Sequence, residues 1–118
     1  MANAIYPKYK EALLNGSANT NMSSGTVKVA LVDTGTYTYS ATHEFLSSLT
    51  GRVGTDATLG TKTFTNGTFD AANSTYTSVS GATVEALVVY IDTGVAGTSR
   101  LIAYIDTATG LPITPNGG

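Results

Sequence analysis

The chain has 118 residues, of which 42% are hydrophobic and 12% are charged, and its formal net charge is −2. This length suffices for one domain with one core, so we predict a single β-rich domain over residues 1–118. The longest apolar run, residues 86–91, falls far short of the roughly 20 residues that cross a bilayer. The absence of cysteine excludes disulfides and thiolate metal sites. Without a basic stripe, we expect neither phosphate-mediated nucleic-acid binding nor a membrane partner.

Threonine is the distinctive component, with 21 residues beside 13 glycines and 3 prolines. Threonine is β-branched and suits half-exposed strands, whereas glycine and asparagine suit turns. We therefore predict a mainly β fold: an antiparallel β-sandwich or barrel-like domain with a short N-terminal helix and one short inserted helical turn. A polar surface with few charges repels its neighbours weakly, which is typical of a protein that self-associates.

Residues 7–15 predict a short helix, because Pro7 suits its first turn and Gly16 suits the position after its end. Residues 1–7 form a candidate N-terminal arm. The first 16 residues lack a signal-peptide pattern, which predicts synthesis in a cytoplasm. The side of the helix expected to dock onto a sheet carries Ile5, Tyr9, and Ala12 or Leu13.

A small polar segment, residues 16–25, predicts a loop before the first strand at 26–32. Residues 36–40 place Tyr37 and Tyr39 on one face and threonine on the other, which predicts a second strand. The triplet at residues 33–35 would then close a hairpin between the two.

Helical spacing replaces the alternation in residues 41–51 and predicts one or two helical turns. Thr42 is the expected cap and Gly51 the expected end. The residues that carry this spacing are Phe45, Leu46 and Leu49.

The second half of the chain reads as a series of strands and turns. Asn66-Gly67 is a two-residue hairpin signal. Residues 82–92 are the most hydrophobic segment and predict a central strand, and Pro112 marks the last strand as an edge. The expected strands are 59–65, 68–70, 74–79, 82–92, 100–106 and 111–114, with turns at 93–99 and 107–110.

Asp-Thr-Gly occurs at residues 33–35 and 92–94, and this triplet is the signature of aspartic proteases. Such an enzyme brings two carboxylates close enough to share one proton. The chain is too short for two catalytic lobes, and a homodimer would need only one triplet per chain. We therefore interpret the aspartates as turn formers that accept hydrogen bonds from backbone N–H groups two residues on. Tyr-Ile-Asp-Thr, at 90–93 and 104–107, is interpreted as a strand end in both copies.

No other pattern predicts a catalytic, cofactor-binding or metal-binding residue, so we expect a protein that is not an enzyme and needs no cofactor. His43 is the only histidine and lies beside Glu44, where a surface or capping role is expected. Asp92 and Asp106 are candidate calcium ligands by residue type, but we expect the ends of paired strands to hold them apart.

Three segments resemble a family of small virion structural proteins of tailed bacteriophages. They are YPKYKEALL at residues 6–14, VKVALVDTGTYTYSATHEFL at 27–46 and TSRLIAYIDTATGLPITPNGG at 98–118. The resemblance covers nearly the whole chain and is weakest over 52–82. Family members continue past such a C-terminal segment into a further strand. Either this strand is absent or the sequence is part of a longer gene product. If the strand is absent, the edge at residues 111–114 would be open to a neighbour.

The resemblance implies a capsid decoration, or cement, protein that bridges subunits of the major capsid protein on the virion surface, after synthesis in the bacterial host cytoplasm. Self-association is also expected. Tyrosine suits such interfaces because it buries area and keeps a polar group. The candidate interface residues are Ile5, Tyr6, Pro7, Tyr37, Tyr39, Leu111 and Ile113.

Two other functions fit the same composition. A tail, neck or head-fibre component would also be β-rich and assembled. A carbohydrate-binding module would be expected to expose aromatic platforms, and the chain has no Trp and 7 Tyr.

Overall fold

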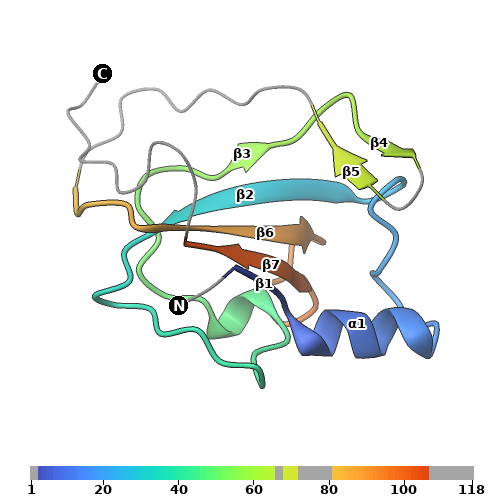
Figure 1. The fold of residues 1–118 in the computed structure, drawn as a ribbon, viewed down its shortest axis with the longest axis horizontal. Helices are drawn as coiled ribbons and strands as arrows, with labels where there is room; N and C mark the ends of the chain where they lie inside the picture. Colours follow the sequence, from blue (N-terminus) through green and yellow to red (C-terminus); the bar gives the residue numbers. More distant parts are fainter. Residues whose placement is uncertain (1–2, 66–67, 72–80, 107–118) are drawn as a thin grey trace.

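The computed structural model describes residues 3–65, 68–71 and 81–106 (Figure 1). Its main sheet has five antiparallel strands in the order β1-β7-β6-β2-β3, and β4 and β5 form a separate two-stranded sheet. The elements are β1 (Ala4–Ile5), α1 (Pro7–Leu14), β2 (Thr26–Val32), the 3-10 helix η1 (Leu46–Ser48), β3 (Ala57–Thr58), β4 (Thr63–Thr65), β5 (Thr68–Asp70), β6 (Ala86–Asp92) and β7 (Leu101–Ile105). The mainly β, antiparallel class is confirmed, with its helix and its short helical turn. A sandwich or barrel is not established by the described residues.

The centre of the sheet is the pairing of β2 with β6. Both strands have seven residues and all seven are in register, from Thr26 opposite Asp92 to Val32 opposite Ala86. Residues opposite one another in an antiparallel pair share a face of the sheet. Lys28 and Tyr90 are therefore on the same face as Ala30 and Val88. The predicted strand at 26–32 and the predicted central strand are both confirmed.

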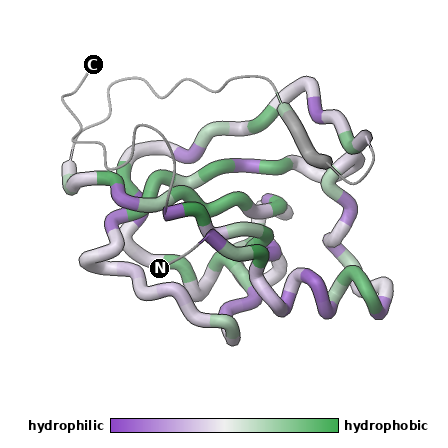
Figure 2. Tube along the Cα trace, in the orientation of Figure 1, coloured by the Kyte–Doolittle hydropathy of each residue, from purple (hydrophilic) through white to green (hydrophobic). Residues whose placement is uncertain are grey.

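One face of this pair forms the core. Four residues on it, Ala30, Val32, Ala86 and Val88, have no exposed surface. The same buried cluster contains Leu46 and Leu49, from the segment around η1. Figure 2 shows the hydrophobic colour concentrated along β2, β6 and β7 and at the C-terminal end of α1. Val27, Leu31 and Ile91, on the opposite face, are also buried, and burial on both faces explains why the longest apolar run in the sequence is the central strand.

The hairpin of β6 and β7 confirms the predicted turn at 93–99. Its register shifts between Val89 and Tyr90, which lie opposite Ala103 and Leu101. Ile102 is therefore an extra residue, and such a bulge increases the local twist. Leu101 and Ile102 are both buried.

Backbone hydrogen bonds extend along the outer sides of β2 and β7, beyond their pairing with β3 and β1. The N–H groups of Leu59 and Val53 donate to the carbonyls of Val27 and Leu31, each at 2.8 Å. Tyr6 N–H donates to Ile102 O at 2.8 Å. The edge strands of the described sheet, β1 and β3, have two residues each, and strands this short are poor templates for strand addition.

The helix docks through the predicted side in part. Tyr9 and Ala12 are buried, whereas Leu13 is 49% exposed. Ile5 belongs to β1, pairs with Ala103 of β7 and is 46% exposed. In Figure 1 α1 follows β1 at the β7 side of the sheet.

The predicted strand at 36–40 and its hairpin with 26–32 are wrong. Asp33 N–H donates to the carbonyl of Gly51 at 2.8 Å, and the amides of Thr36 and Tyr37 donate to Asp33 O at 3.0 Å. The chain therefore turns away after β2, and β2 pairs with β6 instead. Gly51 has a φ of +69°, and a Cβ there would lie 2.9 Å from Asp33 O, so this close approach requires glycine.

The remaining predictions have mixed outcomes. Of the strand predicted at 59–65 only Thr63–Thr65 is a strand, β4, and the central strand predicted at 82–92 begins at Ala86. The helical turn in 41–51 is confirmed as η1, although its N-cap is Phe45 and no side chain caps it. The hairpin predicted from Asn66-Gly67 is confirmed by the register of β4 and β5, with Thr65 opposite Thr68. The predicted strands at 74–79 and 111–114 lie outside the described residues.

Arg100, at the start of β7, connects three segments. Its residue surface is 9% exposed. Its Nε donates to Ala18 O at 2.8 Å, and Nη1 pairs with Glu44 at 2.9 Å. Its guanidinium also lies 5.0 Å from the centre of the Phe45 ring. Arginine suits this position because its planar group can form directed hydrogen bonds and stack at the same time.

We predict that Arg100→Met lowers the free energy of unfolding by about 2 to 3 kcal/mol, because charge-assisted hydrogen bonds are lost from a buried site. Urea denaturation measures the effect. Arg52→Met is the matched control, since that side chain is 42% exposed and pairs with Asp56, and its loss should cost less than about 1 kcal/mol. Equal losses in the two variants would contradict the anchoring role of Arg100.

Candidate functional site

Three predicted interface residues lie where the arm meets the helix. Ile5 is exposed, Pro7 is exposed at the first position of α1, and Tyr6 between them has no exposed surface. Tyr6 therefore packs into the protein's own core and presents nothing to a neighbour. Leu111 and Ile113 lie outside the described residues.

Tyr37 and Tyr39 do not form the surface pair that the sequence predicts. Tyr37 is 2% exposed and Tyr39 is half-buried. The Tyr39 ring lies 5.1 Å from the rings of both Tyr6 and Tyr104, and Tyr37 lies 6.2 Å from Tyr104. These separations are typical of packed aromatic pairs. The three predicted tyrosines do come together, but inside the protein.

A chain of hydrogen bonds runs through this tyrosine cluster. The hydroxyls of Tyr6 and Tyr37 are 2.8 Å apart, and Tyr37 Oη lies 2.7 Å from His43 Nδ1. Burial raises the pKa of both Tyr6 and Tyr37, so both phenols remain protonated donors. His43, for which the sequence predicts a surface or capping role, is half-buried and ends this series of hydrogen bonds.

The turn function of the two aspartates is confirmed. Asp33 Oδ1 accepts from Gly35 N–H, and Asp92 Oδ1 accepts from Gly94 N–H, each at 2.9 Å. Asp33 follows β2 and Asp92 ends β6, and these strands are antiparallel. Asp92 lies opposite Thr26, so the two carboxylates are at opposite ends of the pair, about seven residues or ~23 Å apart. Within one chain they cannot share a proton.

Charged residues meet on the β2–β6 face beside Tyr90. Lys28 pairs with Asp92 at 2.9 Å, and Arg52 pairs with Asp56 at 2.7 Å. The Tyr90 hydroxyl donates to Asp56. Hydrogen bonds from Lys28 and then from Gly94 N–H hold the pKa of Asp92 below its ordinary value. Each carboxylate is thus compensated by a cation, and the cluster is close to neutral.

The described residues contain neither a metal-binding cluster nor a membrane-spanning helix. They contain no group of three or more His, Asp or Glu side chains placed to hold a metal ion. Asp92 and Asp106 follow opposite ends of the β6–β7 pair, as the sequence predicts. No helix in this part of the chain has the length and apolarity of a membrane span.

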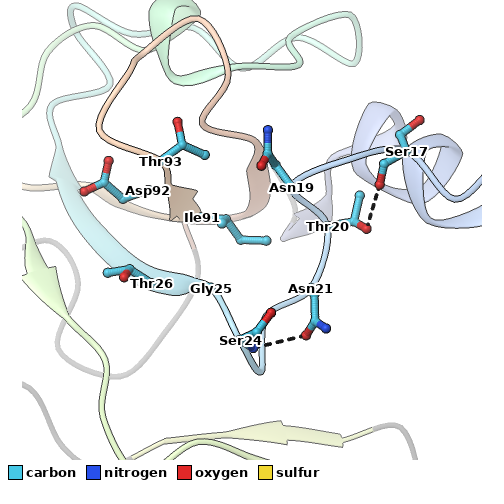
Figure 3. Close-up of a pocket in the computed structure, with 10 residues that line it drawn as sticks. All are labelled: Ser17, Asn19, Thr20, Asn21, Ser24, Gly25, Thr26, Ile91, Asp92 and Thr93. Carbon is cyan, nitrogen blue, oxygen red and sulfur yellow. Dashed lines mark hydrogen bonds between the residues drawn. The ribbon is translucent and has the colours of Figure 1, made fainter.

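An open hollow of about 510 Å³ lies beside the segment 16–25, called here the 16–25 loop (Figure 3). Another, of about 640 Å³, lies beside the charged cluster around Tyr90. The loop contributes Ser17, Asn19, Thr20, Asn21, Ser24 and Gly25. The adjacent strand ends contribute Thr26, Ile91, Asp92 and Thr93. The sequence predicts a loop here but no site, because polar loops of this composition are common. The high density of Ser, Asn and Thr in residues 16–25 is the one sequence feature that could have indicated a site here.

Side chains from elsewhere in the fold hold the 16–25 loop in place through its carbonyl groups. The Tyr9 hydroxyl donates to Thr20 O at 2.8 Å, and Arg100 Nε donates to Ala18 O at 2.8 Å. Lys62 Nζ donates to the carbonyls of both Met22 and Gly25 at 2.6 Å. The loop is therefore irregular in shape but anchored at four points.

No protein-family model, curated protein or solved structure matches this chain. Its function is therefore inferred from the residues and geometry described above.

We predict that Tyr37→Phe lowers the free energy of unfolding by about 1 to 3 kcal/mol, because the buried Tyr6 hydroxyl loses its partner. Replacing both tyrosines with phenylalanine should cost less than the sum of the single losses, since no orphaned hydroxyl remains. Tyr39→Phe is the control, because the Tyr39 ring packs in the same cluster but its hydroxyl takes no part in the hydrogen bonds that link Tyr6, Tyr37 and His43. Additive losses in urea denaturation would contradict the coupling.

We also predict that Asp92 contributes to acid sensitivity. Its folded-state pKa lies below the ordinary 3.8, so its contribution is present above that pH and is lost as pH falls through the lowered value. Asp92→Asn and Lys28→Met should each remove this part of the acid dependence, worth less than about 1 kcal/mol. Unfolding measured across acidic pH tests this, and a profile unchanged in both variants would contradict it.

Proposed function

We propose that this protein is a non-enzymatic structural component of a phage virion, a decoration or cement protein that bridges major capsid subunits on the capsid surface. Two things support the proposal. The sequence resembles small virion proteins over nearly its full length, and the structure exposes large apolar side chains at one end of the sheet. The second observation is the one that carries the proposal.

The exposed apolar residues are at the C-terminal end of α1 and in the β6–β7 turn. Leu14 is 90% exposed, Leu13 is 49% exposed and Val95 is 60% exposed. The 16–25 loop, which follows α1, contacts the β6–β7 turn through a long hydrogen bond of 3.4 Å from Asn19 to Thr98 O. Both apolar elements therefore border the same loop. Apolar side chains exposed on two elements that border one loop are candidates for a protein–protein contact.

Contact through these side chains would supply the binding free energy that a cement protein requires. Full burial of a leucine side chain contributes about 1.5 to 3 kcal/mol, and binding to assembled subunits stabilises the assembly by mass action. The described edge strands, β1 and β3, have only two residues each, so docking by side chains is favoured over strand addition. The low net charge also leaves little repulsion between copies, which supports self-association.

A tail, neck or head-fibre component remains the alternative position. It would use the same exposed residues on a different neighbour. Electron cryo-microscopy of the particle separates the two positions: many copies spread over the shell support cement, whereas a few copies at one vertex support the alternative.

The direct test is binding to empty, expanded phage heads by co-sedimentation. We expect the wild-type protein to bind and to raise the temperature at which the heads disrupt. Leu13→Glu combined with Leu14→Glu should weaken binding at least tenfold, because two apolar contacts worth about 3 kcal/mol or more are lost. Thr38→Glu, a charge added at another exposed position, should bind as the wild type does.

Absence of wild-type binding at high concentration would overturn the cement function. If the leucine double variant binds the heads as tightly as the wild type does, the C-terminal end of α1 is not part of the contact.

A further inference from the structure

The hollow beside the 16–25 loop is built in advance of any ligand. Asn21 Oδ1 accepts the N–H groups of Ser23 at 2.8 Å and Ser24 at 3.2 Å, and Thr20 Oγ1 donates to Ser17 O at 3.1 Å (Figure 3). Together with the anchors from Tyr9, Arg100 and Lys62, these bonds fix the loop before binding. A site fixed in this way loses less conformational entropy when a ligand enters.

Several polar groups around the hollow retain hydrogen-bonding capacity. Within the part of the chain that the structure describes, the side-chain oxygen of Asn19 and the hydroxyls of Ser24 and Thr26 have no protein partner. Asn19 has a φ of +62°, a left-handed conformation that asparagine tolerates better than most residues. These groups combine donors and acceptors, so they suit a ligand that carries both.

The hollow offers little apolar surface. Ile91 points toward the 16–25 loop in Figure 3 and lines the hollow, but it belongs to the core and is 3% exposed. Gly25 allows the chain to pass close to it, since a Cβ there would lie 3.1 Å from Ile91 Cγ2 and 2.8 Å from Asn21 O. The hollow therefore presents mainly hydroxyl and amide groups.

The charges around the hollow select against ionic ligands. Among the described residues of the lining, Asp92 alone is charged, and its carboxylate is already paired with Lys28 at 2.9 Å. An anion would meet no cation in this lining, since Lys62 lies outside it and donates to the carbonyls of Met22 and Gly25, and a cation would have to compete with Lys28. An apolar ligand would leave the polar groups without partners, which is unfavourable.

We propose that this hollow binds a neutral, polyhydroxylated ligand, a saccharide. A sugar offers hydroxyls that donate and accept at once, as Asn19, Ser24 and Thr26 require. The volume of about 510 Å³ is within the range of small-molecule sites, roughly 300 to 1,000 Å³. The hollow is open, so a single sugar should bind weakly, with a Kd on the order of 1 mM. This inference does not depend on the proposed function.

The test is an NMR titration of the ¹⁵N-labelled protein with glucose, galactose, mannose, rhamnose and N-acetylglucosamine, each used separately. Glucuronic acid and glucosamine provide an anionic and a cationic probe. We expect saturable shifts from at least one neutral sugar, confined to residues 17–26 and 91–93. The charged probes should bind more weakly than their neutral counterpart.

Two variants test the residues. Asn19→Gly preserves the left-handed backbone and removes the amide, and Thr26→Val preserves the shape and removes the hydroxyl. Each should weaken binding about fivefold, the net value of one hydrogen bond. Thr58→Val, an exposed threonine of β3, should leave binding unchanged, and retained spectral dispersion shows that each variant is folded.

Three results would overturn the proposal. The first is no saturable shift with any neutral sugar, and the second is shifts centred outside the hollow. The third is an affinity equal to that of the wild type in both the Asn19 and the Thr26 variant.

Discussion

A backbone carbonyl or amide that leaves water must find a partner, and in this protein side chains supply many of those partners. The strands are short, and long stretches between them are irregular. Arg100, Tyr9 and Lys62 donate to carbonyls of the 16–25 loop. The buried hydroxyl of Ser99 accepts from Thr93 N–H and donates to Val95 O within the β6–β7 turn. Irregular backbone of this kind can be as well ordered as a strand if the donors come from rigid elements. Because such donors hold the 16–25 loop, the loop can line a hollow of fixed shape.

The tyrosine cluster meets the same requirement inside the core. Phenol rings bury apolar area, but each hydroxyl must be satisfied where water is excluded. Tyr6 and Tyr37 satisfy one another, and His43 completes the chain at the half-buried side. A core of this type specifies one arrangement of its parts, because a shifted packing would leave hydroxyls unpaired. The arm, the loop after β2 and strand β7 are therefore placed relative to one another by polar contacts as well as by apolar packing.

Much of the local structure could be predicted from the sequence, and the long-range pairing could not. Apolar runs indicated β2 and β6, Pro7 and Gly16 bounded the helix, and Asn66-Gly67 indicated the β4–β5 hairpin, because each signal acts over a few residues. Alternation of tyrosine and threonine at 36–40 imitated a strand, although the buried Tyr37 belongs to an irregular segment. Whether β2 pairs with its neighbour in sequence or with β6 depends on contacts across most of the chain. The hollow gave no distinct signal, since its polar residues also suit a solvated loop.

The strand order β1-β7-β6-β2-β3 has a consequence for how the molecule is made. Tyr6, near the start of the chain, donates its N–H to the carbonyl of Ile102. Strand β2 cannot pair with β6 until β6 has been synthesised. Few native contacts can therefore form until most of the chain has left the ribosome. Proteins dominated by such distant contacts fold slowly, and their apolar strands stay uncovered in the meantime. Chaperone demand during synthesis, rather than the stability of the finished fold, is thus the expected limit on yield.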